Sequence, residues 1–262
     1  MNPTSPPDRT ATPAIRTRGL VKEFRGFRAV GGDDGVDLQV SPGTLHALVG
    51  PNGAGKTTLF HLLTGFARPT AGTIEIHGAD VTGQSPEQIA HAGVARSFQI
   101  TSLFTELSLL AHVELALQGR DGGGHRFWQS DKALAGYADE AHALLHRVGL
   151  DGLARQAAGA LSYGQKRALE LALALALSPR VLLLDEPTAG MGLEDVASTI
   201  DLIASVREDR TVVLVEHNMR VVGSLADRVS VLQFGQVIAE GPYDEVRTDP
   251  RVVTAYLGDS VA

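Results

Sequence analysis

The feature that most constrains this chain is a glycine-rich loop between a strand-like and a helix-like segment. The segment Leu45–Val49 has the pattern of a strand, and a helix is expected over Lys56–Leu63. Glycines let successive backbone N–H groups wrap around phosphate oxygens, and a helix N-terminus adds partial positive charge. Lys56 supplies a full charge to β- and γ-phosphates, and the Thr57 hydroxyl can bind Mg²⁺. The sequence therefore predicts a nucleotide-phosphate site formed by Gly50, Pro51, Asn52, Gly53, Ala54, Gly55, Lys56, Thr57 and Thr58.

Two carboxylates follow a second buried strand. Residues 181–184 are apolar throughout and are followed by Asp185 and Glu186. Open α/β sheets bind ligands at the carboxyl ends of their strands. We expect Asp185 to hold Mg²⁺, directly or through water, and Glu186 to polarise the attacking water as general base. A guanine-reading motif is excluded, because no lysine in the chain is followed two residues later by aspartate.

A third segment, Leu161-Ser162-Tyr163-Gly164-Gln165, begins a long apolar helix. Ser162 can cap this helix, and Gly164 leaves backbone N–H groups open to an anion. The segment resembles the signature Leu-Ser-Gly-Gly-Gln of the ABC ATPases. The resemblance implies that Ser162, Gly164 and Gln165 contact the γ-phosphate of ATP bound by an opposite subunit.

Other positions match the same family, and the resemblance covers the chain from about residue 15 to 258. It implies that Gln99 contacts Mg²⁺ and relays the nucleotide state to a membrane subunit. It also implies that His217 is the switch histidine that reaches the γ-phosphate. Phe24 is similar to the aromatic residue on which adenine stacks, with Phe27 as the alternative. The expected catalytic residues are thus Gln99, Glu186 and His217.

Within the family, the chain looks most like the ATPases of branched-chain amino-acid importers. The stretches that carry this likeness are Gly65-Phe66, Arg96-Ser97-Phe98-Gln99, Leu161-Ser162-Tyr163-Gly164-Gln165, Ala189-Gly190-Met191 and Ala255-Tyr256-Leu257-Gly258. Two positions depart from the pattern. Gly192 stands where Asp or Asn is usual, which removes a side chain that contacts the other subunit. Leu173 replaces a common Arg, so the ion pair usual there is expected to be absent.

The fold class expected is α/β, with a phosphate-loop core, a mostly parallel sheet, an N-terminal antiparallel β part and an inserted helical subdomain. Residues 1–13 are expected to form a flexible tail, and 14–258 one ATPase domain with the helical insert at about 100–160. Expected strands lie at 15–21, 36–40, 45–49, 73–76, 181–184 and 211–215. Expected helices beyond the phosphate loop lie at 109–117, 132–148, 165–177 and 193–206. The helix at 165–177 is apolar on nearly every side, which predicts burial on all faces.

Charge and composition narrow the function classes. A net charge of −7 argues against binding to the phosphate backbone of nucleic acids, which needs a basic surface. The sequence has no cysteine and no apolar run long enough to cross a bilayer, so a role at a membrane requires partner subunits. The resemblance implies transmembrane permease subunits, a second and distinct ATPase subunit, and indirectly a substrate-binding protein. It places the chain at the cytoplasmic face of the cell membrane, held there by the permeases.

Several functions remain open. The interpretation that fits best is ATP hydrolysis coupled to import of branched-chain or other small amino acids. A urea or amide importer and a lipid exporter are alternatives within transport. A soluble ABC ATPase of DNA repair or translation is disfavoured by the single cassette and the acidic charge. A nucleotide sensor that does not hydrolyse ATP is disfavoured by the presence of Glu186 and His217.

Overall fold

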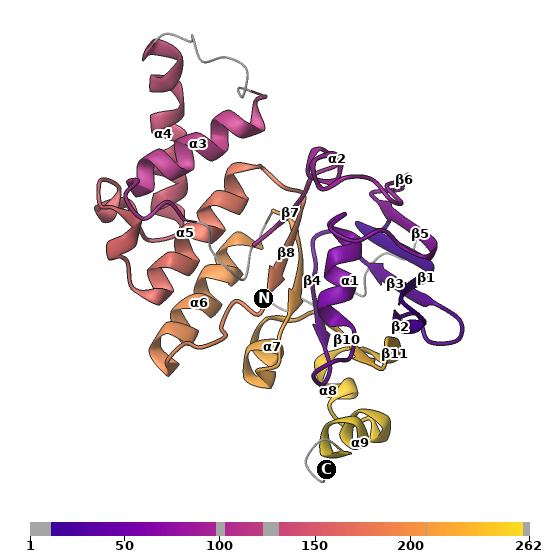
Figure 1. Cartoon of the computed structure of the whole chain (residues 1–262). Helices are drawn as coiled ribbons and strands as arrows, with labels where there is room; N and C mark the ends of the chain where they lie inside the picture. Colours follow the sequence, from indigo (N-terminus) through magenta and orange to yellow (C-terminus); the bar gives the residue numbers. More distant parts are fainter. Residues whose placement is uncertain (1–11, 98–102, 123–130, 208, 259–262) are drawn as a thin grey trace.

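The computed structural model describes residues 12–97, 103–122, 131–207 and 209–258. The expected tail at residues 1–13 therefore falls almost wholly outside the described residues. The central sheet contains β4 (Leu45–Val49), β7 (Val94–Arg96), β8 (Val181–Asp185), β9 (Thr211–Val215), β10 (Arg228–Gln233) and β11 (Gln236–Gly241). Its strand order is β11-β10-β4-β9-β8-β7, and every neighbouring pair is parallel except β10 and β11. The predicted parallel core is confirmed (Figure 1).

A second, antiparallel sheet lies beside the first. It contains β1 (Ile15–Phe24), β2 (Phe27–Val30), β3 (Val36–Val40), β5 (Ala71–Ile76) and β6 (Ala79–Asp80). Each of its strand pairs is antiparallel, as the sequence predicts for the N-terminal part. The strand β1 continues three residues past its predicted end at Val21. Phe24 consequently pairs with Phe27 across the two-residue turn Arg25–Gly26.

Helices cover the parallel sheet and extend beyond it. They are α1 (Lys56–Leu63), α2 (Pro86–His91), α3 (Leu109–Arg120), α4 (Asp131–Arg147), α5 (Tyr163–Ala176), α6 (Leu193–Val206), α7 (Met219–Leu225), α8 (Tyr243–Val246) and α9 (Pro250–Gly258). The helices α3 and α4 lie between β7 and β8 in the chain, pack against each other and against α5, and project away from the sheets (Figure 1). They occupy the position predicted for the helical insert. In the part of the chain that the structure describes, no helix has the length and apolarity needed to traverse a bilayer.

The central strands are buried on both faces because their alternate side chains enter two different cores. Leu182 and Leu184 pack with residues of α3, α4, α5 and α6. Val181 and Leu183 point to the opposite face and pack with α1 and the antiparallel sheet. Residues of β9 divide in the same way. A strand that is apolar at every position is the expected consequence of burial on both faces.

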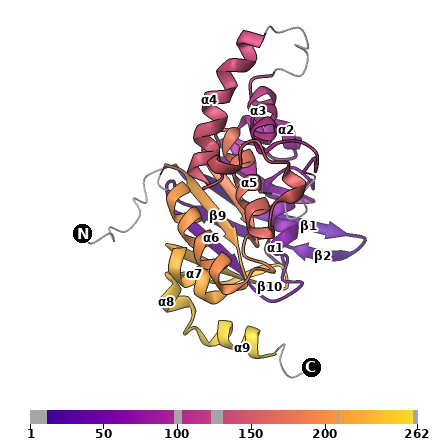
Figure 2. The same ribbon diagram turned by 90° about the vertical axis from the view of Figure 1, so that its left-hand side faces the viewer.

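The C-terminal helices form a third packing region. Val246 of α8 and Val252 of α9 are buried against Ala47 and Val49 of β4. Both helices lie at the end of the molecule opposite to α3 and α4 (Figure 2). The helices α8 and α9 therefore pack against β4, the strand that leads into the glycine-rich loop.

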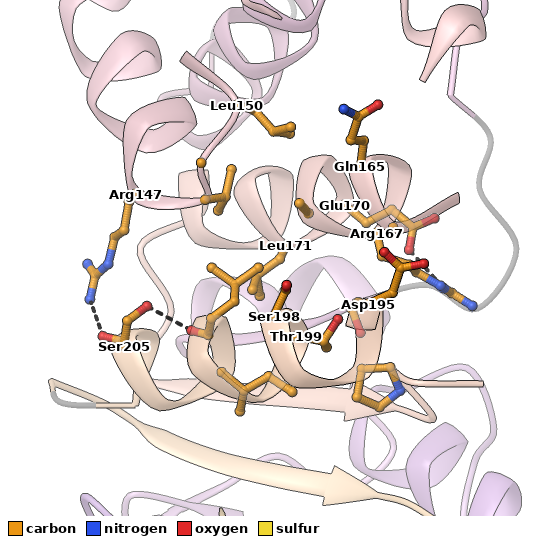
Figure 3. A pocket seen from close by; sticks show the side chains of 18 of the residues that line it. Arg147, Leu150, Gln165, Arg167, Glu170, Leu171, Asp195, Ser198, Thr199 and Ser205 are labelled. Carbon is orange, nitrogen blue, oxygen red and sulfur yellow. Dashed lines mark hydrogen bonds and ion pairs between the residues drawn. The ribbon is translucent and has the colours of Figure 1, made fainter. Parts of the chain in front are cut away.

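The prediction that α5 is buried on all faces is wrong for its first two turns. Residues 164–168 are only partly buried, and Leu173 is partly buried against the helical core. The reason is a groove between α5 and α6 that neither helix fills, with a volume of about 540 Å³ (Figure 3). Leu173, as an apolar residue, forms no ion pair. The same helix has an ion pair one to two turns earlier, between Arg167 and Glu170 at 2.8 Å.

The N-terminus of α6 gives a stability prediction. Gly192 is its N-cap, with extended φ −71° and ψ 166°, no side-chain cap, and open space within 4 Å of the position that a Cβ would occupy. Gly192→Asp should raise the free energy of unfolding by about 0.5–1 kcal/mol, because it supplies a cap and lowers the entropy of the unfolded chain. Urea denaturation measures the change. Gly192→Ala is the matched control, since it changes the entropy without providing a cap. Equal effects of the two variants would contradict a capping contribution.

Candidate nucleotide-binding site

The glycine-rich loop joins the end of β4 to the start of α1. Gly50 has φ +150°, and a Cβ there would lie 2.1 Å from the carbonyl oxygen of Leu232. Gly55, the N-cap of α1, has φ +102°, and its Cβ would lie 2.5 Å from the carbonyl oxygen of Ala29. Any side chain at these two positions would collide with backbone. The glycines are therefore required for the close approach of the loop to its neighbours.

The Lys56 ammonium lies inside the loop. It donates hydrogen bonds to the carbonyl oxygens of Gly50 at 2.6 Å and Pro51 at 3.0 Å. Burial lowers the pKa of Lys56, and the nearby carboxylates of Glu186 and Asp185 act in the opposite direction. The Lys56 ammonium therefore lies at the N-terminus of α1, where it can bind an anion.

A cavity of about 280 Å³ opens over this loop. It is lined by Phe27, Ala29, Asn52, Gly53, Ala54, Gly55, Lys56, Thr57, Thr58 and Glu186. The first turn of α1 contains no acidic residue, and its N-cap has no side-chain hydrogen bond. The amides at the helix start, together with Lys56, thus suit the phosphate chain of a nucleotide.

The two carboxylates predicted after the second strand are where the sequence places them. Asp185 ends β8 and is buried, and its Oδ2 accepts a hydrogen bond from the Arg96 guanidinium of β7. The Arg96 side chain is also nearly buried and lies over the Phe60 ring. Glu186 follows with φ +46°, a left-handed conformation that is uncommon for a residue with a side chain.

Mg²⁺ binds hydroxyl and carboxylate oxygens as ligands. Thr57 in the first turn of α1 and Asp185 supply them, so the residues fit this ion. Gln99, the third predicted ligand, lies outside the described residues. Arg96 already neutralises Asp185, so a cation at this carboxylate would have to share it with the guanidinium.

A buried carboxylate that the sequence analysis did not identify joins two loops at this edge. Glu216 follows β9 and is fully buried. It accepts hydrogen bonds from the Thr188 backbone N–H at 3.1 Å and hydroxyl at 2.5 Å, and from the N–H groups of His217 at 3.0 Å and Asn218 at 3.2 Å. One carboxylate thereby fixes the loop after β8 and the loop after β9. The only signal in the sequence is a single acidic residue directly after the apolar run 212–215.

His217 itself is exposed at the end of β9. The Glu186 N–H donates to the carbonyl oxygen of Val215, so the two loops leave the sheet side by side. The structure thus brings Lys56, Asp185 and Glu186 together, and ties the backbone of His217 to the same edge.

The segment Ser162–Gln165 lies apart from the phosphate cavity. Ser162 caps α5 by accepting a hydrogen bond from the Gln165 N–H at 3.3 Å, and the Gln165 side chain accepts one from the Ser162 N–H at 2.9 Å. The predicted cap is confirmed as a capping box. Ser162, Gly164 and Gln165 line the groove between α5 and α6, where Figure 3 shows Gln165, Arg167 and Asp195.

The two aromatic candidates differ in position. Phe27 is 68% exposed and lines the phosphate cavity. Phe24 is 49% exposed, and the Lys22 ammonium lies over its ring at 4.7 Å from the centroid. Because the two residues are paired across a hairpin, both rings lie on one face of it.

The Glu216 network gives a second stability prediction. Glu216→Gln should lower the free energy of unfolding by about 2–4 kcal/mol, because an amide nitrogen cannot accept the hydrogen bonds that one carboxylate oxygen now receives. Denaturant titration measures this. Glu75→Gln, which alters a partly exposed carboxylate paired with Arg16 and Arg18, should cost less than about 1 kcal/mol. Similar costs for the two variants would contradict the role given to Glu216.

The chain matches known proteins over nearly its whole length. The ABC transporter family model matches residues 34–189, and the model of the branched-chain amino acid ATP-binding cassette transporter matches residues 236–262. The high-affinity branched-chain amino acid transport ATP-binding protein BraF of Pseudomonas aeruginosa is 38% identical over 259 residues, covering 95% of this chain and 99% of the relative. The corresponding protein LivG of Escherichia coli is 36% identical over 255 residues, with 95% and 99% covered.

Solved structures agree with the sequence matches. The ATP-binding cassette MJ1267 of an ABC transporter, in its ADP conformation, has a TM-score of 0.81 at 29% identity, covering 94% of this chain and 99% of that one. A nucleotide-free ATP-binding cassette from an ABC transporter has a TM-score of 0.80 at 28% identity, covering 93% and 98%. With the glycine-rich loop before α1, the carboxylates after β8 and the capping box of α5 in place, the chain belongs to the ATP-binding subunits of the ABC transporter family.

Proposed function

We propose that this chain hydrolyses ATP to drive the import of branched-chain or other small amino acids through transmembrane permease subunits. The observation that carries the ATPase part is the cavity shared by the phosphate loop and Glu186. The C-terminal match at residues 236–262 and the relatives BraF and LivG support the choice of substrate. The import of ureas or amides, or lipid export, is the alternative that a transport assay distinguishes.

ATP phosphates would be held by the amides of the phosphate loop and by Lys56, which must turn from its loop carbonyls toward the β- and γ-oxygens. Thr57, Asp185 and Gln99 would hold Mg²⁺, which, when bound, neutralises charge on these phosphates. Asp185 would share its carboxylate between this ion and the guanidinium of Arg96.

Glu186 would accept the proton of the water that attacks the γ-phosphorus, and ADP would leave on the opposite side. His217 would donate a hydrogen bond to the γ-phosphate. The Glu216 network supports this arrangement, since it holds the backbone of His217 and the loop of Glu186 against each other.

The adenine ring would stack on an aromatic side chain of the β1–β2 hairpin. Phe24 is the residue that the resemblance favours, but the exposure of Phe27 within the phosphate cavity supports Phe27 as the alternative. A base needs an unobstructed aromatic face, and the Phe24 ring already carries the Lys22 ammonium.

A complete site would need a second ATPase subunit. Ser162, Gly164 and Gln165 lie in the α5–α6 groove and not in the phosphate cavity of their own chain. They would instead contact ATP held by the partner, whose own signature segment would complete the site at Lys56. We infer a distinct paralogue as partner, since Gly192 differs from the residue usual at this contact.

The transporter would comprise this chain, that second ATPase, two permeases and, indirectly, a substrate-binding protein. The chain would lie at the cytoplasmic face of the membrane, held by the permeases. Reconstituted vesicles containing the complex and ATP should accumulate labelled leucine or another small amino acid. Uptake of urea, or loss of lipid from the membrane, in place of amino-acid uptake would contradict the proposal.

Lys56→Ala should abolish productive ATP binding. The loss of a charge-assisted contact to phosphate costs about 1.5–3 kcal/mol, a decrease in affinity of about 10- to 150-fold. Calorimetry with ATP and Mg²⁺ measures this, with circular dichroism to check folding. Arg251→Ala removes a cation of α9 that is not part of the cavity lining, and this variant should bind ATP normally. Wild-type affinity in Lys56→Ala would contradict the assignment of the phosphate loop.

Glu186→Gln should leave ATP binding intact and lower turnover by about 10²- to 10⁴-fold, because the shape is kept and the base is removed. An ATP-bound closed pair should then accumulate, which light scattering after gel filtration detects. Glu87→Gln on the exposed face of α2 is the matched control and should hydrolyse ATP at the wild-type rate. Turnover near wild type in Glu186→Gln would place the base elsewhere.

A further inference from the structure

Tyr163, the first residue of α5, links the signature segment to the loop after β8. Its hydroxyl donates a hydrogen bond to the carbonyl oxygen of Ala189 at 3.1 Å. The same hydroxyl accepts one from Arg167 at 3.0 Å, and the Arg167 guanidinium lies over the Tyr163 ring at 5.4 Å from its centroid. Arg167 is in turn paired with the nearly buried Glu170. This series of contacts starts inside α5 and ends on the backbone of another segment.

The acceptor belongs to the turn that holds Glu186. The Ala189 N–H donates to the Glu186 carbonyl oxygen at 3.1 Å, and the Met191 N–H donates to that of Thr188 at 3.2 Å. Ala189 is therefore bonded to Glu186 through its N–H and to Tyr163 through its carbonyl. Ala189 thus connects Tyr163 with Glu186.

The conformation of Glu186 needs such support. A left-handed φ of +46° at a residue with a side chain is unfavourable by about 1 kcal/mol or more, and it persists where the surroundings enforce it. The supports in the structure come from β9, through Val215 and Glu216, and from α5, through Tyr163. Asp195 of α6 lies close to the start of α5, since a Cβ at Gly164 would be 3.3 Å from its carboxylate.

We propose that Tyr163 is a positioning residue that couples the signature segment of this chain to the Glu186 of the same chain. The inference rests on the proposed function, in which Ser162, Gly164 and Gln165 serve the partner's ATP. Movement of the start of α5 toward that ATP would pass through the Tyr163 hydroxyl to the Glu186 turn. Engagement of one site would in this way be communicated to the base of the other site.

Tyr163→Phe tests the coupling, because it keeps the ring and removes only the hydroxyl. The kcat for ATP should fall about 3- to 10-fold, the effect of one neutral hydrogen bond, with the KM for ATP within about twofold. Hydrogen exchange at the backbone amides of residues 188–191 should accelerate. Tyr137→Phe is the matched control: its hydroxyl donates to Asp121 in the helical part, and its loss should leave both readouts unchanged. Unchanged exchange and kcat in Tyr163→Phe would overturn the proposal.

A pair of subunits with one inactivated site separates this role from a direct signature role. With the partner's catalytic carboxylate replaced, turnover depends on Glu186 of this chain, and Tyr163→Phe should lower it about 3- to 10-fold. With Glu186→Gln in this chain and an active partner, Tyr163→Phe should have no effect. The reverse pattern would overturn the proposal, since Tyr163 would then act on the partner's ATP. If Glu186→Gln itself left turnover unchanged in the first pair, the proposed function would fail, and the inference with it.

Discussion

The burial of β4, β8 and β9 on both faces is the constraint on which the site depends. Their side chains enter cores that are almost wholly apolar, so the charged groups gather where the strands end. His46 of β4 is a buried polar exception and is hydrogen-bonded to Ser230 of β10. Parallel strands end at one edge, which brings the phosphate loop, the β8 carboxylates and the loop after β9 together. Polar groups buried at that edge need partners. The chain supplies them: loop carbonyls for Lys56, Arg96 for Asp185, and two loops for Glu216.

The features that the sequence predicts well are those determined by neighbouring residues. The capping box of α5 spans Ser162 to Gln165, and the phosphate loop is recognised from one short run of residues. The interactions that were not predicted join distant residues. The pairs Arg96–Asp185, Thr188–Glu216 and Tyr163–Ala189 are separated by 89, 28 and 26 residues. A single sequence carries no signal for such pairings, because each partner has an ordinary local alternative as a solvated side chain or a cap.

The helix α5 and the β1–β2 hairpin show a further limit. Apolarity around α5 indicates that the helix is covered, but it does not say how closely α6 approaches, and the groove leaves the first turns partly exposed. For the hairpin, the sequence offers two phenylalanines close together. The two-residue turn sets them opposite each other on one face, and only the position of that turn relative to the phosphate loop brings Phe27 into the cavity.

The turn around Glu186 is held by a few hydrogen bonds, of which the two to the Glu216 carboxylate are charge-assisted and the others are neutral. A neutral hydrogen bond contributes about 0.5–1.5 kcal/mol, and the left-handed Glu186 opposes part of that sum. A ligand shifts such an equilibrium only through its different affinity for the two arrangements, and charge-assisted contacts to a phosphate are of comparable size. The backbone attachments of this turn come from β9 and from α5, two elements that lead to His217 and to the signature segment. A nucleotide that engages either element would therefore act on the turn through bonds that its own contacts are strong enough to rearrange.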